Sequence, residues 1–395
     1  MDKPIPSNKI YFENLDTLRF LAFFAVFASH SMLKTGILEL SNNDFYKRVI
    51  NFTMSGGVGV SFFFVLSGFL ITYLIIKEIE ETNKLNIKYF YIRRTLRIWP
   101  LFFFVVIFGF FIYPILKKMI GMDTNLPNQI WYYISFLSNF DSIYIAQNKL
   151  QATSPMMVGI TWSVSIEEQF YLVWPLLFMV YPKKWYPLIF IKVIVISSLF
   201  RYFNRADTDV IYYHTLSVMS NLAVGGLFAY YSLNSSLFLH TITQMKKWLI
   251  ILIYVFGFSI MFYGNYIYPS IYDIVLIPIL NAVFFGFIIL EQNFSQHSLF
   301  KYGRLKYLSM LGKYTYGLYL LHPIAIQVMI ITYKLLKITP DGFPIGFPQT
   351  IIYSTGAFAI SLIISWLSYH YLEIYFLKLK DKFTTETIST QKTKI

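Results

Sequence analysis

The stretch GGVGVSFFFVLSGFLIT, Gly56–Thr72, decides the fold class, because it lies in a long apolar run that contains no charged side chain. A helix needs about 20 consecutive apolar residues to cross the hydrocarbon core of a bilayer. The run from 57 to 76 meets that length, and it includes the small residues Ser61, Ser67 and Gly68. Small residues let neighbouring transmembrane helices approach closely. The stretch therefore predicts a membrane-spanning helix that packs tightly against others.

Apolar runs of this kind recur along the whole chain of 395 residues, of which 56% are hydrophobic and 13% charged. A soluble domain carries about twice that share of charge. The pattern predicts an all-α polytopic membrane protein with about ten transmembrane helices. We interpret residues 1–380 as one integral-membrane domain and residues 381–395 as a disordered cytoplasmic tail. The predicted spans are 15–33, 57–76, 98–116, 161–181, 186–200, 212–231, 247–263, 271–290, 307–333 and 350–371.

The charged and sulfur-containing residues limit the location and the chemistry. Cysteine is absent, which excludes disulfides, thiolate metal sites and a cysteine nucleophile. No metal-ligand spacing is present, so we predict no metal. If the N-terminus is cytoplasmic, the segments on that side hold about twice as many Lys and Arg residues as the outer segments. The net charge of +13 is then explained by topology rather than by nucleic acid. We expect a plasma (inner) membrane protein with both termini cytoplasmic and membrane lipid as a partner.

The first predicted span contains RFLAFFAVFASH, in which every residue between Arg19 and His30 is apolar except Ser29. Eleven helical steps of about 100° place Arg19 and His30 on one face, about 16 Å apart along the axis. Asp16 lies near that face and can pair with Arg19 at i, i+3. Ionisable residues inside a span are costly and mark functional sites. The alternative is structural, with an anchor at the inner interface and His30 bonded to a neighbouring helix.

Three arginines lie where the third span enters from the predicted cytoplasmic side. Arg93 and Arg97 are at i, i+4, and Arg94 and Arg97 at i, i+3, so the three form one basic patch. A guanidinium suits phosphate because its planar fork donates two hydrogen bonds at once. Taken alone, positive-inside anchoring explains this patch better than a binding site does.

Two acidic residues, Glu167 and Glu168, follow Trp162 in the fourth span with no positive neighbour. Glu167 would lie about 8 Å along the helix from Trp162, in the outer half of the membrane, where His30 is also expected. A carboxylate beside an imidazole fixes its tautomer and supports proton transfer. We therefore expect Glu167 to orient His30, whereas Glu168 points elsewhere.

Together these segments resemble the membrane acyltransferase type 3 family, whose members acylate extracytoplasmic glycans and other acceptors. The resemblance covers nearly the whole chain and is to the stand-alone form, without a fused SGNH-type domain. One departure is EIYF (Glu373–Phe376), where the family usually has Glu-x-Pro-Phe. The resemblance is carried by six motifs in order: LDTLRFLAFFAVFASH, GVGVSFFFVLSGFLIT, RRTLRIWPLFF, WSVSIEEQFYLVWP, YTYGLYLLHPI and LSYHYLEIYFLKLK.

The resemblance implies a role for each matching residue. His30 matches the catalytic histidine, and Glu167 matches the acidic residue that we pair with it. His322 matches a histidine of the late motif to which we assign no role. The residues expected along the path of the acyl donor are Arg19, Arg93, Arg94 and Arg97.

The family draws its acyl group from acyl-CoA, so the resemblance implies an O-acetyltransferase that uses acyl-CoA, most simply acetyl-CoA, as donor. The CoA phosphates would rest on the basic patch, and the pantetheine arm would pass Arg19 and present the thioester near His30. His30 would act as general base on a hydroxyl of an extracytoplasmic glycan or glycolipid acceptor, such as O-antigen, capsule or exopolysaccharide. The alternative is attack by His30 itself, which gives an acyl-histidine.

Two other functions fit parts of the sequence. A proton-coupled transporter of a small solute would also place ionisable residues in its spans, but no inverted repeat or pair of broken spans supports it. A membrane-bound O-acyltransferase of another class would use His322, in LYLLHPIAIQ, as its working histidine. That scheme leaves the spacing of Arg19 and His30 without a role.

Overall fold

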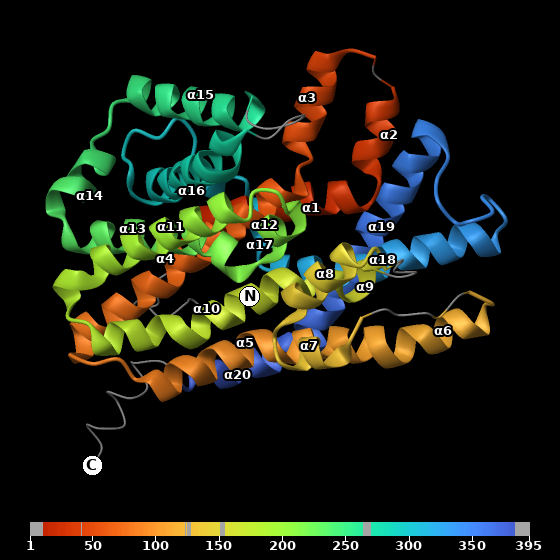
Figure 1. Ribbon diagram of the computed structural model, residues 1–395, viewed down its shortest axis with the longest axis horizontal. Coiled ribbons are helices and arrows are strands. Elements are labelled where there is room, and N and C mark those ends of the chain that lie inside the picture. Colours follow the sequence, from red (N-terminus) through yellow and green to blue (C-terminus); the bar gives the residue numbers. More distant parts are fainter. Residues whose placement is uncertain are drawn as a thin grey trace.

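The computed structural model describes residues 11–40, 42–122, 124, 128–150, 155–263 and 270–383, and these form helices and connecting turns without a strand (Figure 1). In this part of the chain, 7 helical segments are long and apolar enough to cross a membrane, or up to 9 if each of 2 bent pairs is one span. The predicted all-α, polytopic membrane class is confirmed. Of the predicted tail, 381–395, nearly all lies outside the described residues.

Five helices surround the region that the sequence singles out: α1 (Glu13–His30), α4 (Gly56–Thr82), α5 (Ile87–Ile107), α10 (Thr161–Val180) and α18 (Thr315–Leu335). The other helices are α2 (Leu33–Glu39), α3 (Asp44–Thr53), α6 (Tyr113–Met119), α7 (Ile130–Ile134), α8 (Ser138–Gln147), α9 (Pro155–Gly159), α11 (Tyr186–Phe203), α12 (Thr208–Tyr213), α13 (Thr215–Asn234), α14 (Ser236–Thr243), α15 (Lys247–Tyr263), α16 (Ile271–Phe294), α17 (Lys306–Gly312), α19 (Gly346–Ser368) and α20 (Ile374–Asp381).

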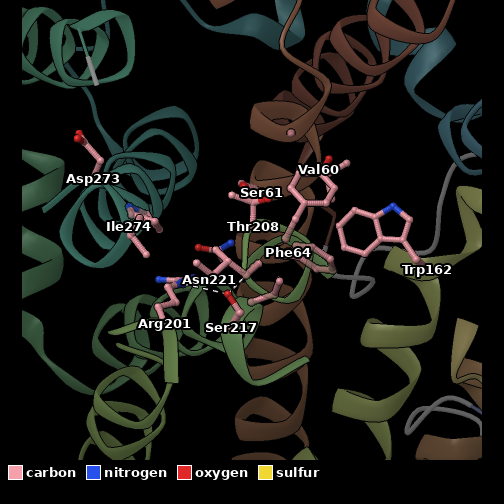
Figure 2. A pocket seen from close by; sticks show the side chains of 15 residues that line it. Val60, Ser61, Phe64, Trp162, Arg201, Thr208, Ser217, Asn221, Asp273 and Ile274 are labelled. Atoms are coloured by element: carbon pink, nitrogen blue, oxygen red, sulfur yellow. Dashed lines mark hydrogen bonds between the residues drawn. The ribbon is translucent and has the colours of Figure 1, made fainter. Parts of the chain in front are cut away.

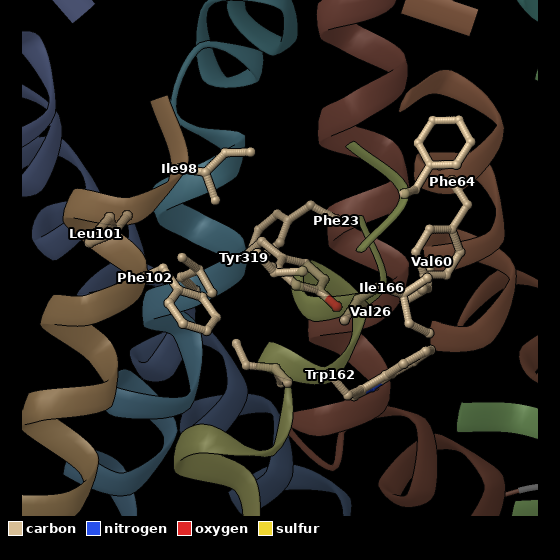
Figure 3. Packing of buried hydrophobic residues seen from close by; sticks show 14 of the residues in the cluster. Phe23, Val26, Val60, Phe64, Ile98, Leu101, Phe102, Trp162, Ile166 and Tyr319 are labelled. Carbon is tan, nitrogen blue, oxygen red and sulfur yellow. The ribbon is translucent and has the colours of Figure 1, made fainter. Parts of the chain in front are cut away.

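The five helices share a buried hydrophobic cluster. Its side chains interdigitate between helices that are far apart in sequence (Figure 3). Burial of this apolar surface among side chains rather than lipid is what fixes the relative positions of the helices. The cluster includes Phe23, Val26, Val60, Phe64, Leu101, Phe102, Trp162, Ile166 and Tyr319.

Two glycines join α4 to α13. A Cβ atom on Gly68 would lie 2.0 Å from the carbonyl oxygen of Leu222, and one on Gly225 would lie 2.0 Å from that of Val65. No side chain fits at such distances, so the two backbones touch only because both residues are glycine. We call this pair, Gly68 and Gly225, the glycine seam. It confirms the close packing predicted for the second span.

Two predicted spans are broken. The span 15–33 ends as α1 at His30 and bends by 64° into α2, where Met32 has a left-handed φ of 65°. The span 307–333 is divided into α17 and α18. At the break, Gly312 packs so closely on α1 that a Cβ atom on Gly312 would lie 2.3 Å from the backbone carbonyl oxygen of Asp16. The first break places His30 at the end of a helix, beside the loops.

The fourth predicted span, 161–181, is the helix α10. It is not among the helices that are long and apolar enough to count as spans. The predicted ten spans are therefore reached only when both bent pairs and α10 are counted. Its N-terminal half is polar, and Thr161, Ser163 and Ser165 are buried in the bundle. These polar side chains lower the hydropathy of α10 while they bring hydrogen-bonding groups into the core.

The long connection that precedes α10 contains short helices. Within it, residues 128–140 are divided between α7 and α8. Asp141 of α8 is buried and accepts hydrogen bonds from Asn128 Nδ2 (3.0 Å) and from the Tyr133 hydroxyl (3.1 Å). Burial raises the pKa of the Asp141 carboxyl. Asn128 and α8 line one cavity together with His30.

Candidate active site

Two histidines meet where α1 ends. His30 Nδ1 lies 2.9 Å from His322 Nε2 of α18, and the two ring planes are nearly parallel, at 11°. His322 is fully buried, and its ring meets the edges of Phe23 and Phe27. His30 is only half-buried. One imidazole of the pair is therefore enclosed and the other is accessible.

The backbone of α18 decides which nitrogen of each ring carries the proton. His322 Nδ1 lies 2.7 Å from the carbonyl oxygen of Tyr319. That carbonyl would ordinarily accept from the N–H four residues on, but the residue there is Pro323, which has none. Because a carbonyl oxygen only accepts, His322 must hold its proton on Nδ1. The carbonyl freed by Pro323 thus fixes the tautomer of His322.

The tautomer of His322 fixes that of His30 in turn. With its proton on Nδ1, His322 presents a lone pair at Nε2, so a neutral His30 must donate from Nδ1. The remaining nitrogen, His30 Nε2, then keeps its lone pair and can accept a proton. His30 lines a cavity of about 300 Å³ that is bounded by residues of α8, α10, α12 and α18. The arrangement is that of a general base held by a second imidazole.

The predicted contact between Glu167 and His30 is not formed. Glu167 accepts hydrogen bonds from Ser67 Oγ of α4 (2.6 Å) and from the Tyr171 hydroxyl (3.0 Å). Helix geometry predicts a similar depth for both residues, but α10 turns Glu167 toward Ser67 of α4 and not toward the end of α1. In the described part of the chain, the hydrogen-bond partner of the His30 ring is His322.

The other predicted polar residues gather at the opposite end of the bundle. Arg19 pairs with Asp16 at i, i+3, as predicted. Arg97 is exposed although it interacts electrostatically with Arg19 and with Glu167. Arg97 is thus an accessible cation within a group of charges. Glu373 also acts on Arg97, and it lies in a π-helical turn between α19 and α20.

The three arginines of the basic patch differ in how they are held. Arg93 Nη2 forms an ion pair with Glu78 (2.7 Å), and its Nη1 donates to the carbonyl oxygen of Phe383. Arg94 lies over the Tyr171 ring, and its buried Nε has no hydrogen-bond partner. Arg93 is therefore occupied by contacts within the protein, whereas Arg94 and Arg97 retain donors for a ligand.

Tyr319 links the two ends of the bundle through the core. Its hydroxyl lies 2.7 Å from Ser163 Oγ of α10, one turn before Glu167, and its carbonyl holds His322. Tyr319 also interacts electrostatically with Glu167. Polar groups thus continue through the apolar core from the arginines to the histidine pair.

Sequence reasoning missed three residues of this site. The role of His322 was left open, although the proline that follows it was the available signal. Trp162 and Tyr213 line the His30 cavity, and in the described residues neither the indole N–H nor the phenol has a hydrogen-bond partner. Tryptophan and tyrosine are common at the membrane interface in any case, so their residue types alone do not mark a site.

Comparisons with known proteins agree with the resemblance found in the sequence. The chain is 30% identical over 224 residues to a peptidoglycan O-acetyltransferase of Listeria monocytogenes, a match that covers 52% of this chain and 31% of that protein. It is 34% identical over 222 residues to an uncharacterized protein of Haemophilus influenzae, over 51% of this chain and 86% of that protein. The chain thus spans about a third of the length of the Listeria protein. No solved structure matches.

A family profile described as an acyltransferase domain, Acyl_transf_3, matches residues 12–370. The match includes both histidines and the basic patch. The chain is an integral-membrane protein that belongs to this acyltransferase family.

Proposed function

We propose that this protein transfers an acyl group, most simply acetyl, from cytoplasmic acyl-CoA to a hydroxyl of an extracytoplasmic glycan. The observation that carries the proposal is the accessible lone pair of His30 Nε2, set by His322 and directed at a cavity. In this proposal the protein lies in the plasma membrane with both termini in the cytoplasm, as the distribution of Lys and Arg favours.

The donor enters from the arginine end. Its phosphates contact Arg94 and Arg97, which retain free donors, while Arg93 holds α5 against Glu78. Arg19, whose side chain is 21% exposed, interacts electrostatically with Arg97 and lies on the same path. The pantetheine arm is long and flexible, so it can carry the thioester from this end toward His30. Glu167 and Glu373 limit the net charge of the arginines when the donor is absent.

The reaction takes place at the other end. An acceptor hydroxyl gives its proton to His30 Nε2 as its oxygen attacks the thioester carbonyl. Negative charge then develops on the carbonyl oxygen, and acyl transfer needs hydrogen-bond donors at that position. The indole N–H of Trp162 and the hydroxyl of Tyr213 line the cavity without partners, and we assign them to this role. The proton on His30 afterwards passes to the thiolate of CoA, which leaves as the thiol.

His322 is a positioning residue in this scheme. Both of its ring nitrogens are engaged, Nδ1 with the Tyr319 carbonyl and Nε2 with His30. It has no lone pair left for a substrate, which argues against the alternative in which His322 is the working base. Its part is to keep the proton of His30 on Nδ1.

The test uses inside-out membrane vesicles supplied with radiolabelled acetyl-CoA, and it follows label into glycan. Wild-type vesicles are expected to label glycan, and His30→Ala is expected to reduce the rate by about 10²- to 10⁴-fold, the usual contribution of a general base. His297→Ala is the matched control, because His297 is exposed. Normal transfer by a folded, fully expressed His30→Ala protein would refute the proposed mechanism.

Sidedness is tested in the same preparation. Intact right-side-out vesicles are expected to show no labelling until they are permeabilised, because acetyl-CoA does not cross a bilayer. Labelling of these vesicles before permeabilisation would place the donor site on the outer face and would contradict the proposed orientation.

A further inference from the structure

A buried arginine lies at the end of the bundle that carries the histidines. Arg201 is in the last turn of α11 and is only 3% exposed. No carboxylate forms an ion pair with it in the described residues, and burial is the one strong influence on its charge. A buried cation without an acid is expensive to maintain.

Hydrogen bonds satisfy only part of the Arg201 guanidinium. Nε donates to Ser217 Oγ (3.2 Å) and Nη2 to Ser220 Oγ (2.9 Å). Nη1 is buried and has no partner. The carbonyl end of α11 favours a cation at this position, but it leaves this donor unsatisfied. A buried charged donor without a partner is costly, which indicates that a ligand accepts the hydrogen bond from Arg201 Nη1.

Arg201 lines a cavity of about 250 Å³ that also contains the side chains of Asn221 and Ser61 (Figure 2). In the described residues neither the Asn221 amide nor the Ser61 hydroxyl has a hydrogen-bond partner. Asp273 lines the far side, where its carboxylate is held by Ser270 at the start of α16 and points away from Arg201. The cavity therefore presents two free polar groups, the Asn221 amide and the Ser61 hydroxyl, beside one positive charge.

This cavity adjoins the one that contains His30. Trp162 lines both of them. Its ring lies 5.1 Å, between centroids, from both Tyr212 and Tyr213, and the rings of these two tyrosines are 4.8 Å apart. Tyr212 faces the Arg201 cavity and Tyr213 faces the His30 cavity. Sugar rings stack well on aromatic faces, so a saccharide can extend along this wall from one cavity to the other.

We infer that Arg201, Asn221 and Ser61 form a site for an oxyanion of the acceptor glycan, a carboxylate or a phosphate carried by a sugar. The inference rests on the proposed function and narrows its acceptor to an acidic saccharide. The oxyanion bound at Arg201 anchors the chain, Trp162 supports a sugar ring, and a hydroxyl reaches His30. A guanidinium with a free nitrogen and a neighbouring amide suits either anion.

Binding is measured without turnover, so that the result does not depend on the transfer reaction. Purified His30→Ala protein in phosphatidylcholine nanodiscs is titrated with a fluorescent tetra-uronate, with its carboxamide derivative, and with a neutral tetrasaccharide with and without a terminal phosphate. We expect one acidic probe to bind about 10- to 100-fold more tightly than its neutral counterpart, the effect of a charged hydrogen bond. The probe preferred, uronate or phosphate, identifies the source of the oxyanion.

Added to His30→Ala, the change Arg201→Gln is expected to abolish this preference and Arg201→Lys to retain part of it. Arg205→Gln is the matched control, because Arg205 lies near the same end and donates to a backbone carbonyl. Ser61→Leu, which fills the cavity and leaves the arginine in place, is expected to weaken binding of the acidic probe as well. Neutral and acidic probes that bind equally, or a preference that survives Arg201→Gln, would overturn the inference.

Two further outcomes separate the inference from its rivals. If nanodiscs that contain phosphatidylglycerol stabilise the protein against heat through Arg201, the occupant is a lipid headgroup and the assignment to the acceptor is wrong. If an acidic saccharide binds through Arg201 but the wild type transfers no acetyl group to it, the binding site stands and the proposed function fails.

Discussion

The two ends of the helix bundle control charge in different ways. At the arginine end, carboxylates accompany the cations: Asp16 pairs with Arg19, and Glu78 pairs with Arg93. At the histidine end, the backbone carbonyl of Tyr319 fixes the proton of His322. Only hydroxyl groups and the end of a helix support Arg201. In the proposed function, acids hold cations in place where a polyanionic donor enters, whereas neutral groups set the position of a proton on the proposed base.

The largest expected effect tests whether Arg93 belongs to the structure of the arginine end rather than to the donor site. Arg93→Ala leaves the carboxylate of Glu78, whose side chain is 6% exposed, without its partner. Removal of one member of a buried ion pair costs about 3–5 kcal/mol of stability. Thermal unfolding in detergent is expected to show this loss. The double change Arg93→Met with Glu78→Leu is expected to recover most of it, and full stability of Arg93→Ala alone would contradict the assignment.

The next effect concerns the proton at the histidine end. His322→Phe removes the acceptor for His30 Nδ1, so the tautomer with a free Nε2 is no longer favoured, and kcat is expected to fall by about 10- to 100-fold. His322→Gln can still accept through its amide oxygen and is expected to restore part of the rate. Labelled acetyl transfer at saturating donor measures both variants. Equal rates for Phe and Gln would show that His322 only fills space.

A smaller effect is expected for the accessible arginine of the donor end. Arg97→Ala removes one charge-assisted contact, so KM for acetyl-CoA is expected to rise about tenfold while kcat changes little. Thermal stability should stay near that of the wild type, in contrast to Arg93→Ala. A fall in kcat without a change in KM would place Arg97 near the reaction and not in the donor path.

The smallest effect is expected at the wall between the two outer cavities. Trp162→Phe keeps the aromatic face but removes the indole N–H. We expect kcat to fall severalfold, which corresponds to a loss of about 1–2 kcal/mol of transition-state stabilisation, while the KM for the acceptor stays unchanged. Steady-state kinetics with a saccharide acceptor measure the two constants separately. A rise in acceptor KM alone would limit Trp162 to stacking.

The sequence predicted local relations well and contacts between helices poorly. The i, i+3 pair of Asp16 and Arg19 follows from helical geometry alone and is confirmed. The depth of Glu167 could also be calculated, but the direction in which α10 turns it depends on neighbours that no single sequence specifies. For the same reason the sequence did not predict the contact between His30 and His322, which lie 292 positions apart.

Arg201 is a second residue whose contacts with another helix could not be predicted from the sequence. Its position near the end of a predicted span was compatible with an exposed loop, and only the packing of α11 against α13 buries it. The glycines were easier to interpret, because a residue without a side chain in a membrane helix has few uses other than close approach. The packing role of a glycine in a membrane helix was predictable from the sequence. The surroundings of a charged residue such as Arg201 were not, because a charged residue can serve several purposes.

The glycine seam has a mechanical consequence. With the main chains of α4 and α13 in direct contact at Gly68 and Gly225, neither helix can slide or rock past the other without atomic overlap. The two helices therefore move as one body, and alternating access, which a transporter requires, has no sliding surface at this seam. In the proposed function α4 and α13 thus form a stationary part of the protein. The moving part is then the substrate itself: the donor arm extends inward, and one small group crosses the barrier while the carrier stays behind.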